Sequence, residues 1–158
     1  MDTKYFEKIR IFDGGMGQEL LSKGLISKGT LWSASALIDK EFHKLVIDAH
    51  ISFINAGADI IVTNNFSARK IRFIQNKVVD KFQYANEQAG ILANKAREIS
   101  KQNILIAGSL PSQSDTYVED ERSSSEIQSD FEEQAKIISP YVDFFYLDVV
   151  SSGREIEI

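Results

Sequence analysis

Residues 42–63 read FHKLVIDAHISFINAGADIIVT, in which a helical pattern stops at a glycine and a short apolar run follows at once. Within the segment 39–56, apolar side chains recur at helical spacing: Phe42, Leu45, Val46, Ala49 and Phe53. Asp39 can cap the start of this helix, and Gly57 can end it. The run DIIVT at 59–63 is typical of a strand that is buried on both faces. The stretch therefore predicts a helix followed directly by a buried strand.

The same alternation recurs along the chain. Four apolar runs predict buried strands: IRIF at 9–12, DIIVT at 59–63, NILIAG at 103–108 and VDFFYLDVV at 142–150. Two further helical stripes lie between them: Phe82, Ala85, Ala89, Leu92, Ala93 and Ala96, then Ile127, Phe131, Ala135 and Ile138. Ser125 and Gln128 predict a capping box for the last helix, and Pro140 predicts its end. We therefore predict an α/β fold with about four parallel strands, and loops at 25–34 and 111–124.

Composition limits the classes of partner. The chain has 158 residues, a hydrophobic fraction of 43% and a formal charge of −5, which suit one globular domain over residues 1–158. Without a basic cluster, we expect neither nucleic acid nor a membrane surface as the partner, but a small molecule. No apolar run approaches the roughly 20 residues of a membrane span, and no signal-peptide core is present, so we expect a cytoplasmic protein. The sequence contains no cysteine, which excludes thiol nucleophiles and thiolate metal ligands within it.

The segment RIFDGGMG at 10–17 follows the first expected strand with an acid and a glycine pair. It fails the dinucleotide fingerprint, since Leu20 stands at the third glycine position, and no P-loop pattern occurs. Asp13 could instead bind an ammonium group, while the exposed backbone N–H groups of Gly14 and Gly15 bind a carboxylate. An amino acid would satisfy both. The alternative is that Asp13 caps the short helix that follows and the glycines form a tight turn.

Polar side chains also follow the other expected strands. They are Thr63, Asn64 and Asn65 after the second strand, Ser109 after the third and Asp148 near the end of the fourth. In parallel α/β folds, ligands bind at the carboxyl ends of the strands, so these side chains are candidates for one site. Each could instead cap a neighbouring helix.

Two histidines and one tryptophan need separate interpretation. His43 and His50 lie seven residues apart on one expected helix, about 10.5 Å, which is too far for one metal ion. We expect both to be partly exposed on the helix surface. Trp32 either anchors the loop around it or forms a wall of the site, and its large apolar area favours the anchor.

Six motifs in order resemble the N-terminal half of homocysteine S-methyltransferases. They are FDGGMGQELLSKGL, LWSASALI, AHISFINAGADIIVTNNF, NEQAGILANKARE, IAGSLP and FEEQAKIISPYVDFFYLD. The resemblance implies the first half of a (β/α)8 TIM barrel. It also implies transfer of a methyl group to homocysteine, giving methionine, from a donor such as S-methylmethionine, S-adenosylmethionine, betaine or a methylfolate. By resemblance, Asp13 would bind the substrate amine, the Gly14 and Gly15 backbone its carboxylate, and Thr63, Asn65 and Ser109 would line the pocket.

The chain departs from this family in two respects. The family has a Leu-Glu-Thr motif after its fourth strand, whereas this sequence has Leu147, Asp148 and Val149, so the carboxylate reaches one methylene less. The family's zinc is held by three cysteines of its second half, which this chain lacks, so we expect no zinc site in the chain alone. The expected helix after the fourth strand is also replaced by SSGREIEI at 151–158.

We therefore expect a truncated, homocysteine-binding half domain that is inactive alone and leaves two sheet edges open. Such edges favour association with a second copy or with a complementary C-terminal half. A non-enzymatic amino-acid-binding or regulatory module, or the remnant of an interrupted gene, is the alternative. A doubly wound nucleotide-binding domain is disfavoured by the failed phosphate fingerprints.

Overall fold

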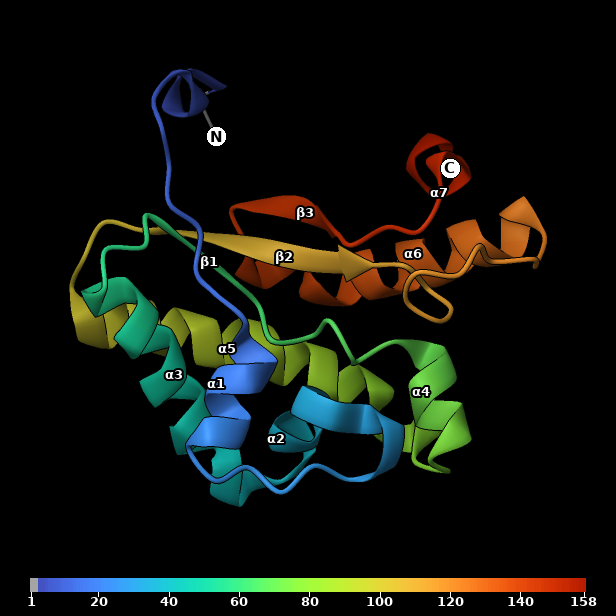
Figure 1. The fold of residues 1–158 in the computed structure, drawn as a ribbon, viewed down its shortest axis with the longest axis horizontal. Helices are drawn as coiled ribbons and strands as arrows, with labels where there is room; N and C mark the ends of the chain where they lie inside the picture. Colours follow the sequence, from blue (N-terminus) through green and yellow to red (C-terminus); the bar gives the residue numbers. More distant parts are fainter. Residues whose placement is uncertain (1–2) are drawn as a thin grey trace.

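The computed structural model describes residues 3–158 and contains a parallel sheet of three strands with the order β1-β2-β3 (Figure 1). The strands are β1 (Ile60–Val62), β2 (Leu105–Pro111) and β3 (Phe144–Asp148). Ile60 is paired with Leu105, and Ala107 with Phe144. The predicted α/β class with parallel βα units is confirmed, because each connection between the strands contains a helix.

The first of the four expected strands is reduced to a single bridge. Phe12 pairs with Ile60 in parallel, and Asp13 N–H donates to the Ile60 carbonyl at 2.9 Å. Upstream of this point, Ile9 is 94% exposed and Ile11 is 56% exposed, so little burial stabilises an extended strand there. The bridge still fixes where Asp13 leaves the sheet.

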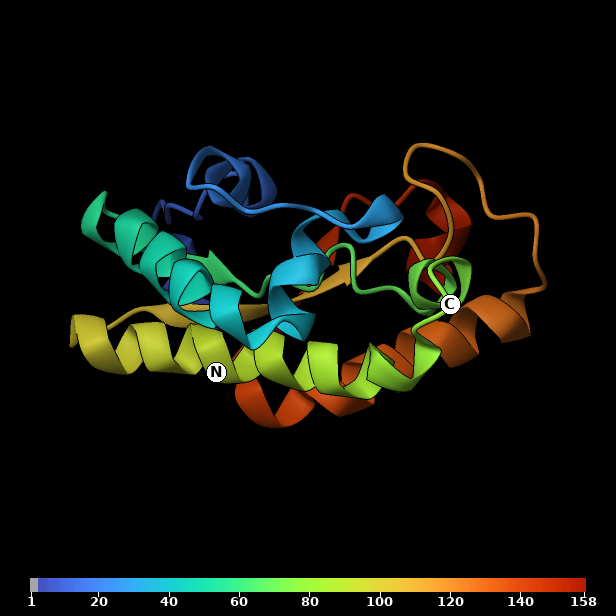
Figure 2. The ribbon, with the colours of Figure 1, turned by 90° about the horizontal axis from the view of Figure 1, so that it is seen from below.

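Three helices pack the core as the apolar stripes predict. They are α3 (His43–Asn55), which a 3₁₀ turn precedes, α5 (Phe82–Ser100) and α6 (Ser124–Ile138). Their buried residues form two clusters. The first includes Val46, Ala49, Ala89 and Leu92, and the second joins Ile54 and Ala93 to Ile61 of β1 and Ile106 of β2. In Figure 2 the long helices α5 and α6 lie on one side of β2, while the loop 112–123 lies on the other.

The helix ends differ in part from the prediction. The capping box of α6 is Ser123 with Glu126, and the expected pair Ser125 and Gln128 is wrong by two residues. The Ser123 hydroxyl accepts from the Glu126 N–H, and the Glu126 carboxylate accepts from the Ser123 N–H at 3.0 Å. Asp39 makes no side-chain cap and pairs with Lys28 Nζ at 2.6 Å instead.

Several short helices surround the sheet ends. They are α1 (Met16–Ser22), α2 (Ser35–Ile38), α4 (Lys70–Gln75) and α7 (Gly153–Glu157). A 3₁₀ helix at Gly29–Ala34 occupies most of the expected loop 25–34. The residues SSGREIEI at 151–158, which follow the last strand, contain the short α7, and its capping box is formed by Ser152 and Glu155.

The strand β3 contradicts the expectation of burial on both faces. Phe145, Tyr146 and Leu147 are 41%, 38% and 44% exposed. β3 lies at the edge of the sheet, and within residues 3–158 only β2 pairs with it. None of the helices described is long and apolar enough to cross a membrane.

Candidate functional site

A cavity of about 610 Å³ lies at the carboxyl ends of the strands. Its wall includes residues from the segment after Phe12, the end of β1, the end of β3 and the loop 112–123. The side chains and backbone that line it include Asp13, Gly14, Gly15, Trp32, Thr63, Asn64, Phe66, Arg69, Arg72, Tyr117, Tyr146 and Asp148. Five of the predicted site residues are therefore brought together: Asp13, Gly14, Gly15, Thr63 and Asp148.

Asp13 contacts the end of β1 and does not cap a helix. Its Oδ2 accepts a hydrogen bond from the Val62 N–H at 2.9 Å, whereas the N-cap of α1 is Gly15, without a side-chain bond. Burial, and to a lesser extent the negative charge of Asp148, raise the pKa of the Asp13 carboxyl from 3.8 to about 7. The side chain is thus poised to bind a cation, because a nearby positive charge would favour its ionised form.

Asp148 is held by a hydroxyl from the neighbouring strand. The Ser109 Oγ–H donates to Asp148 Oδ2 at 2.8 Å, and burial raises the pKa of this carboxyl as well. Two partly desolvated carboxylates therefore line one cavity, and such an environment favours a positively charged group.

The two glycines have different surroundings. A Cβ at Gly14 would lie 2.9 Å from the Phe53 ring, so packing already excludes a side chain there. A Cβ at Gly15 would meet nothing closer than the Gln18 side chain at 4.0 Å. Among residues 3–158, no acceptor pairs with the backbone N–H groups of Gly14 and Gly15. The open side of Gly15 and these two donors leave room for a ligand oxygen.

Two expected pocket residues, Asn65 and Ser109, lie beneath the cavity and not in its lining. Asn65 Nδ2 donates to the Ser109 carbonyl at 2.9 Å, and its Oδ1 accepts from the Thr63 hydroxyl at 2.6 Å. The Thr63 hydroxyl also accepts from the Ser109 N–H at 3.0 Å. These contacts fix the ends of β1 and β2 relative to each other, so Asn65 and Ser109 hold residues that line the cavity.

Two buried amides that sequence reasoning missed extend this network onto the helices. Asn86 on α5 accepts from Asn65 Nδ2 at 3.2 Å and from Gln134 Nε2 on α6 at 3.0 Å. Both amides are completely buried. The signal that could have found them is an amide inside an otherwise apolar helical stripe.

Trp32 combines the two alternatives that the sequence left open. It lines the cavity, and a Cβ at Gly17 would lie only 2.5 Å from its ring. Its own backbone has a φ of 46°, an uncommon conformation for a residue with a side chain. The ring therefore packs on the bare backbone of α1 while it forms one wall of the site.

The histidines lie apart from the cavity. His43 is partly exposed as expected, with Nε2 at 3.0 Å from the Leu37 carbonyl oxygen. The same expectation is wrong for His50, which is completely buried because it lies on the side of α3 that also buries Val46 and Ala49. Within residues 3–158, neither ring nitrogen of His50 has a partner, and burial lowers its pKa to about 3.

The donor set does not fit the zinc site that the resemblance implies. The sequence has no cysteine, and among residues 3–158 no three histidines or acids are grouped closely enough to hold a metal ion. The two carboxylates of the cavity lack the third ligand that a catalytic zinc needs.

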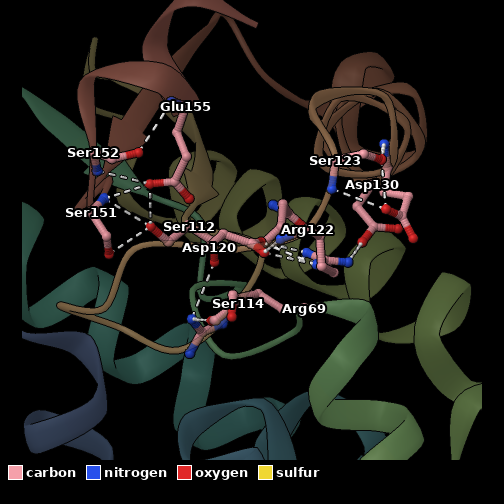
Figure 3. A network of polar contacts seen from close by, with 12 residues as sticks. Arg69, Ser112, Ser114, Asp120, Arg122, Ser123, Asp130, Ser151, Ser152 and Glu155 are labelled. Carbon is pink, nitrogen blue, oxygen red and sulfur yellow. Dashed lines mark hydrogen bonds and ion pairs between the residues drawn. The ribbon is translucent and has the colours of Figure 1, made fainter.

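A polar network fixes the loop 112–123 over the cavity (Figure 3). The Ser112 hydroxyl donates to the Glu155 carboxylate at 2.9 Å, and the Ser151 N–H donates to the same carboxylate at 2.7 Å. At the other end of the loop, Arg122 forms ion pairs with Asp120 and Asp130. The loop residues Thr116 and Tyr117 are thereby kept in the cavity wall.

Comparisons with known proteins agree with this geometry. The sequence profile of homocysteine S-methyltransferase matches residues 10–158. The homocysteine S-methyltransferase of Escherichia coli is 28% identical over 111 residues, which are 66% of this chain and 35% of that protein. Homocysteine S-methyltransferase 2 of Zea mays is 31% identical over 90 residues, 57% of this chain and 24% of its relative.

The crystal structure of the Escherichia coli homocysteine methyltransferase MmuM, in its metallated form, superposes with a TM-score of 0.82 at 23% identity. The match covers 98% of this chain and 59% of that one. The likeness shows the fold, and the chain spans well under two thirds of the length of these relatives.

Proposed function

The chain belongs to the homocysteine S-methyltransferase family, and we propose that its cavity binds the amino-acid end of homocysteine. The observation that supports this most is the pair Asp13 and Asp148, two acids with raised pKa values in one cavity. An ammonium group between them would relieve their repulsion and replace the water that burial removes.

Each predicted site residue has a role in this proposal. Asp13 accepts a hydrogen bond from the substrate ammonium, and Asp148, aimed by Ser109, is the second acceptor. The free N–H groups of Gly14 and Gly15 bind the carboxylate, and Thr63 lines the site. Asn65 is a positioning residue that acts through Thr63 and Ser109.

Asp148 stands where the family has a glutamate, and its side chain is shorter by one methylene. The Ser109 hydroxyl compensates in part, because it holds the carboxylate at one position in the cavity. We propose that Asp148 is a weaker partner for the ammonium group than Asp13.

Methyl transfer requires more than this chain contains. In the family, a cysteine-bound zinc makes the homocysteine thiol a thiolate. The residues of this sequence include no cysteine for that role, so we propose that they bind the substrate and that a complementary C-terminal half supplies the thiol-activating groups. The unpaired edge of β3 and its exposed Phe145 and Leu147 offer the surface for such a complementary C-terminal half or for a second copy.

A second candidate function is a non-enzymatic module that binds an amino acid. The complete absence of cysteine favours it, because the cavity needs no thiolate ligand to hold an amino acid. The two candidates differ in one result: only the first gives methionine from homocysteine and a methyl donor when the cysteine-containing half of a relative is added.

Calorimetric titration tests the binding proposal that both candidates share. Homocysteine should bind more tightly than 4-sulfanylbutanoic acid, which lacks the amine. Asp13→Asn should weaken homocysteine binding by about 1.5 to 3 kcal/mol, the value of a charge-assisted hydrogen bond, and should leave the amine-free compound unaffected. Asp80→Asn, on the surface, is the control. Equal affinity of homocysteine for the wild type and Asp13→Asn would refute the proposed role of Asp13.

A further inference from the structure

The wall of the cavity contains two positive charges that the proposed amino-acid site does not use. Arg69, the residue before α4, and Arg72, in its first turn, both line the cavity. They come from a different element than Asp13 and Asp148. The loop residues Thr116 and Tyr117 line the same cavity.

Arg69 is buried without a carboxylate. It is 2% exposed, and its Nη1 donates to the carbonyl oxygens of Ser112, at 3.1 Å, and Ser114. Its guanidinium lies over the Phe66 ring, with 5.4 Å between Cζ and the ring centroid. Within residues 3–158, Arg69 forms no ion pair, so its charge is compensated by neutral dipoles and by more distant acids alone. Burial, and next the charge of Arg72, lower the pKa of Arg69 to about 10.

Arg72 has one partner at the protein surface. Its Nη2 lies 2.8 Å from Asp115 Oδ1, and the Asp115 side chain is 61% exposed. An ion pair so exposed to water is weak. Glu155, a second acid whose charge acts on Arg69, accepts from the Ser112 hydroxyl and from two backbone N–H groups through Oε2, and its buried Oε1 has no partner among residues 3–158. Arg72 thus has one exposed carboxylate as its ion-pair partner, and Arg69 has none among residues 3–158.

Both arginines also retain unused donors. Within the part of the chain that the structure describes, Nε of Arg69 and Nε of Arg72 are buried and donate to no protein atom. A buried donor without an acceptor costs about 1 to 3 kcal/mol, and more when it is charged. The cavity therefore has an acidic part with no cation and a basic part with too few anions.

We propose that Arg69 and Arg72 bind the carboxylate of a small molecule in this cavity. Arg69 Nη1 and Arg72 Nη2 are already engaged, which leaves Arg69 Nη2 and Arg72 Nη1 to donate to the two oxygens of a carboxylate. The inference deepens the proposed function, since the carboxylate belongs either to the methyl donor or to homocysteine itself. In the second case the arginines, and not the Gly14 and Gly15 backbone, bind the homocysteine carboxylate.

Two pairs of probes distinguish these sources in calorimetric titrations of the intact chain. Glycine betaine and choline share a trimethylammonium group, and only betaine has a carboxylate. Homocysteine and 3-aminopropane-1-thiol share the amine and the thiol, and only homocysteine has a carboxylate. Arg72→Gln should weaken at least one carboxylate-containing probe about tenfold or more and leave its partner without a carboxylate unchanged.

Two further variants control for folding. Arg97→Gln removes a comparable arginine, 2.8 Å from Asp143 and away from the cavity, and should leave all four affinities unchanged. Asp115→Asn removes the acid that competes for Arg72 and should strengthen binding of the same probe. Because a misfolded protein would not bind more tightly, stronger binding by Asp115→Asn would not be an effect of misfolding.

Selective weakening of betaine would assign the carboxylate to the methyl donor, and selective weakening of homocysteine would assign it to the substrate. If betaine and homocysteine each bind the wild type, Arg72→Gln and Asp115→Asn with the same affinity, the carboxylate site does not exist. The proposed function is tested by a separate result. It requires that Asp13→Asn weaken the binding of 3-aminopropane-1-thiol, whose affinity should not depend on the two arginines.

Discussion

Asp13, which follows the bridge at Phe12, and Asp148, the last residue of β3, line one cavity, where burial and then their mutual repulsion raise the pKa of Asp13 to about 7. This pair costs stability when both carboxyls are ionised and no ligand is bound. Protonation of the Asp13 carboxyl therefore affects both ligand binding in the cavity and the free energy of unfolding.

Asp13→Asn should stabilise the protein at alkaline pH. A folded pKa near 7 above an unfolded value near 3.8 means that the folded chain binds more protons in this window, so stability is lost as the pH rises through it. Asparagine stays neutral and can still accept from the Val62 N–H. The free energy of unfolding, measured with urea, should be higher for the variant than for the wild type by up to about 4 kcal/mol at pH 8, and almost equal at pH 4. An equal difference at both pH values would contradict the raised pKa.

Homocysteine binding should release a proton near pH 6. In the free cavity the Asp13 carboxyl is largely protonated there, and an ammonium group beside it lowers its pKa. Affinity should therefore rise between pH 5 and pH 7. Titrations in buffers with different ionisation enthalpies measure the released proton. Asp13→Asn should abolish both the release and the pH dependence, and a release that persists in this variant would assign the proton to another group.

Gly17→Ala should disturb Trp32, because the new Cβ would lie 2.5 Å from the ring. We expect a loss of about 1 to 3 kcal/mol, reduced by the higher helix propensity of alanine in α1. Trp32 is the only tryptophan, so its fluorescence should shift as well. Gly15→Ala, which meets no close atom, should keep the fluorescence and the stability but weaken ligand binding. A wild-type emission spectrum of Gly17→Ala would show that the ring is not held there.

His50→Leu should stabilise the protein by about 1 to 3 kcal/mol at neutral pH, because both ring nitrogens are buried without a partner. The pKa of His50 is lowered to about 3, so only the unfolded chain binds its proton as the pH falls below about 6.5, and stability is lost in that direction. The advantage of the leucine should thus widen from pH 7 to pH 4. Thermal melts of both proteins across this range measure it, and a constant difference would mean that the pKa of His50 is the same in the folded and the unfolded chain.

The exposed edge strand β3 should make the chain associate. Phe145 and Leu147 are exposed, and alternation along the strand places them on the same face, so a second chain can cover both. Light scattering should show a mass above 17.8 kDa that falls on dilution. Leu147→Lys should weaken association about tenfold or more, whereas Ile99→Lys, on the exposed side of α5, should not. A strictly monomeric wild type at high concentration would exclude this surface.

The sequence predicts those parts of the fold that depend on local pattern. The strands β1 and β2 and the helices α3, α5 and α6 appear because their apolar runs bury side chains in the two core clusters, whereas β3 is held by its pairing with β2. Asp13, Thr63 and Asp148 could be found because strand ends in a parallel sheet open on one side. The short strand at 9–12 could not be judged, because its length depends on burial that Ile9 and Ile11 do not obtain.

Arg69 could not have been found from the sequence. It stands in SARKIRF, a stretch whose charge predicts a solvated loop, and its burial results from carbonyl oxygens of Ser112 and Ser114 more than 40 residues later. Asn86 and Gln134 each interrupt an apolar helical stripe, which marks them in the sequence, but their partners lie on other elements and could not be predicted. Contacts between distant segments decide which polar residues a cavity contains, and the periodicity of the sequence does not predict these contacts.

The carboxylate of Glu155 joins the last helix to the end of β2, because Ser112, Ser151 and Ser152 all donate to it. Local unfolding of α7 would remove this attachment and weaken the hold on the loop 112–123, which contributes Thr116 and Tyr117 to the cavity and is also held by Arg69 and by the ion pairs of Arg122. We expect the two segments to open together. Occupancy of the cavity would slow amide hydrogen exchange in α7, a helix that lies outside the cavity lining.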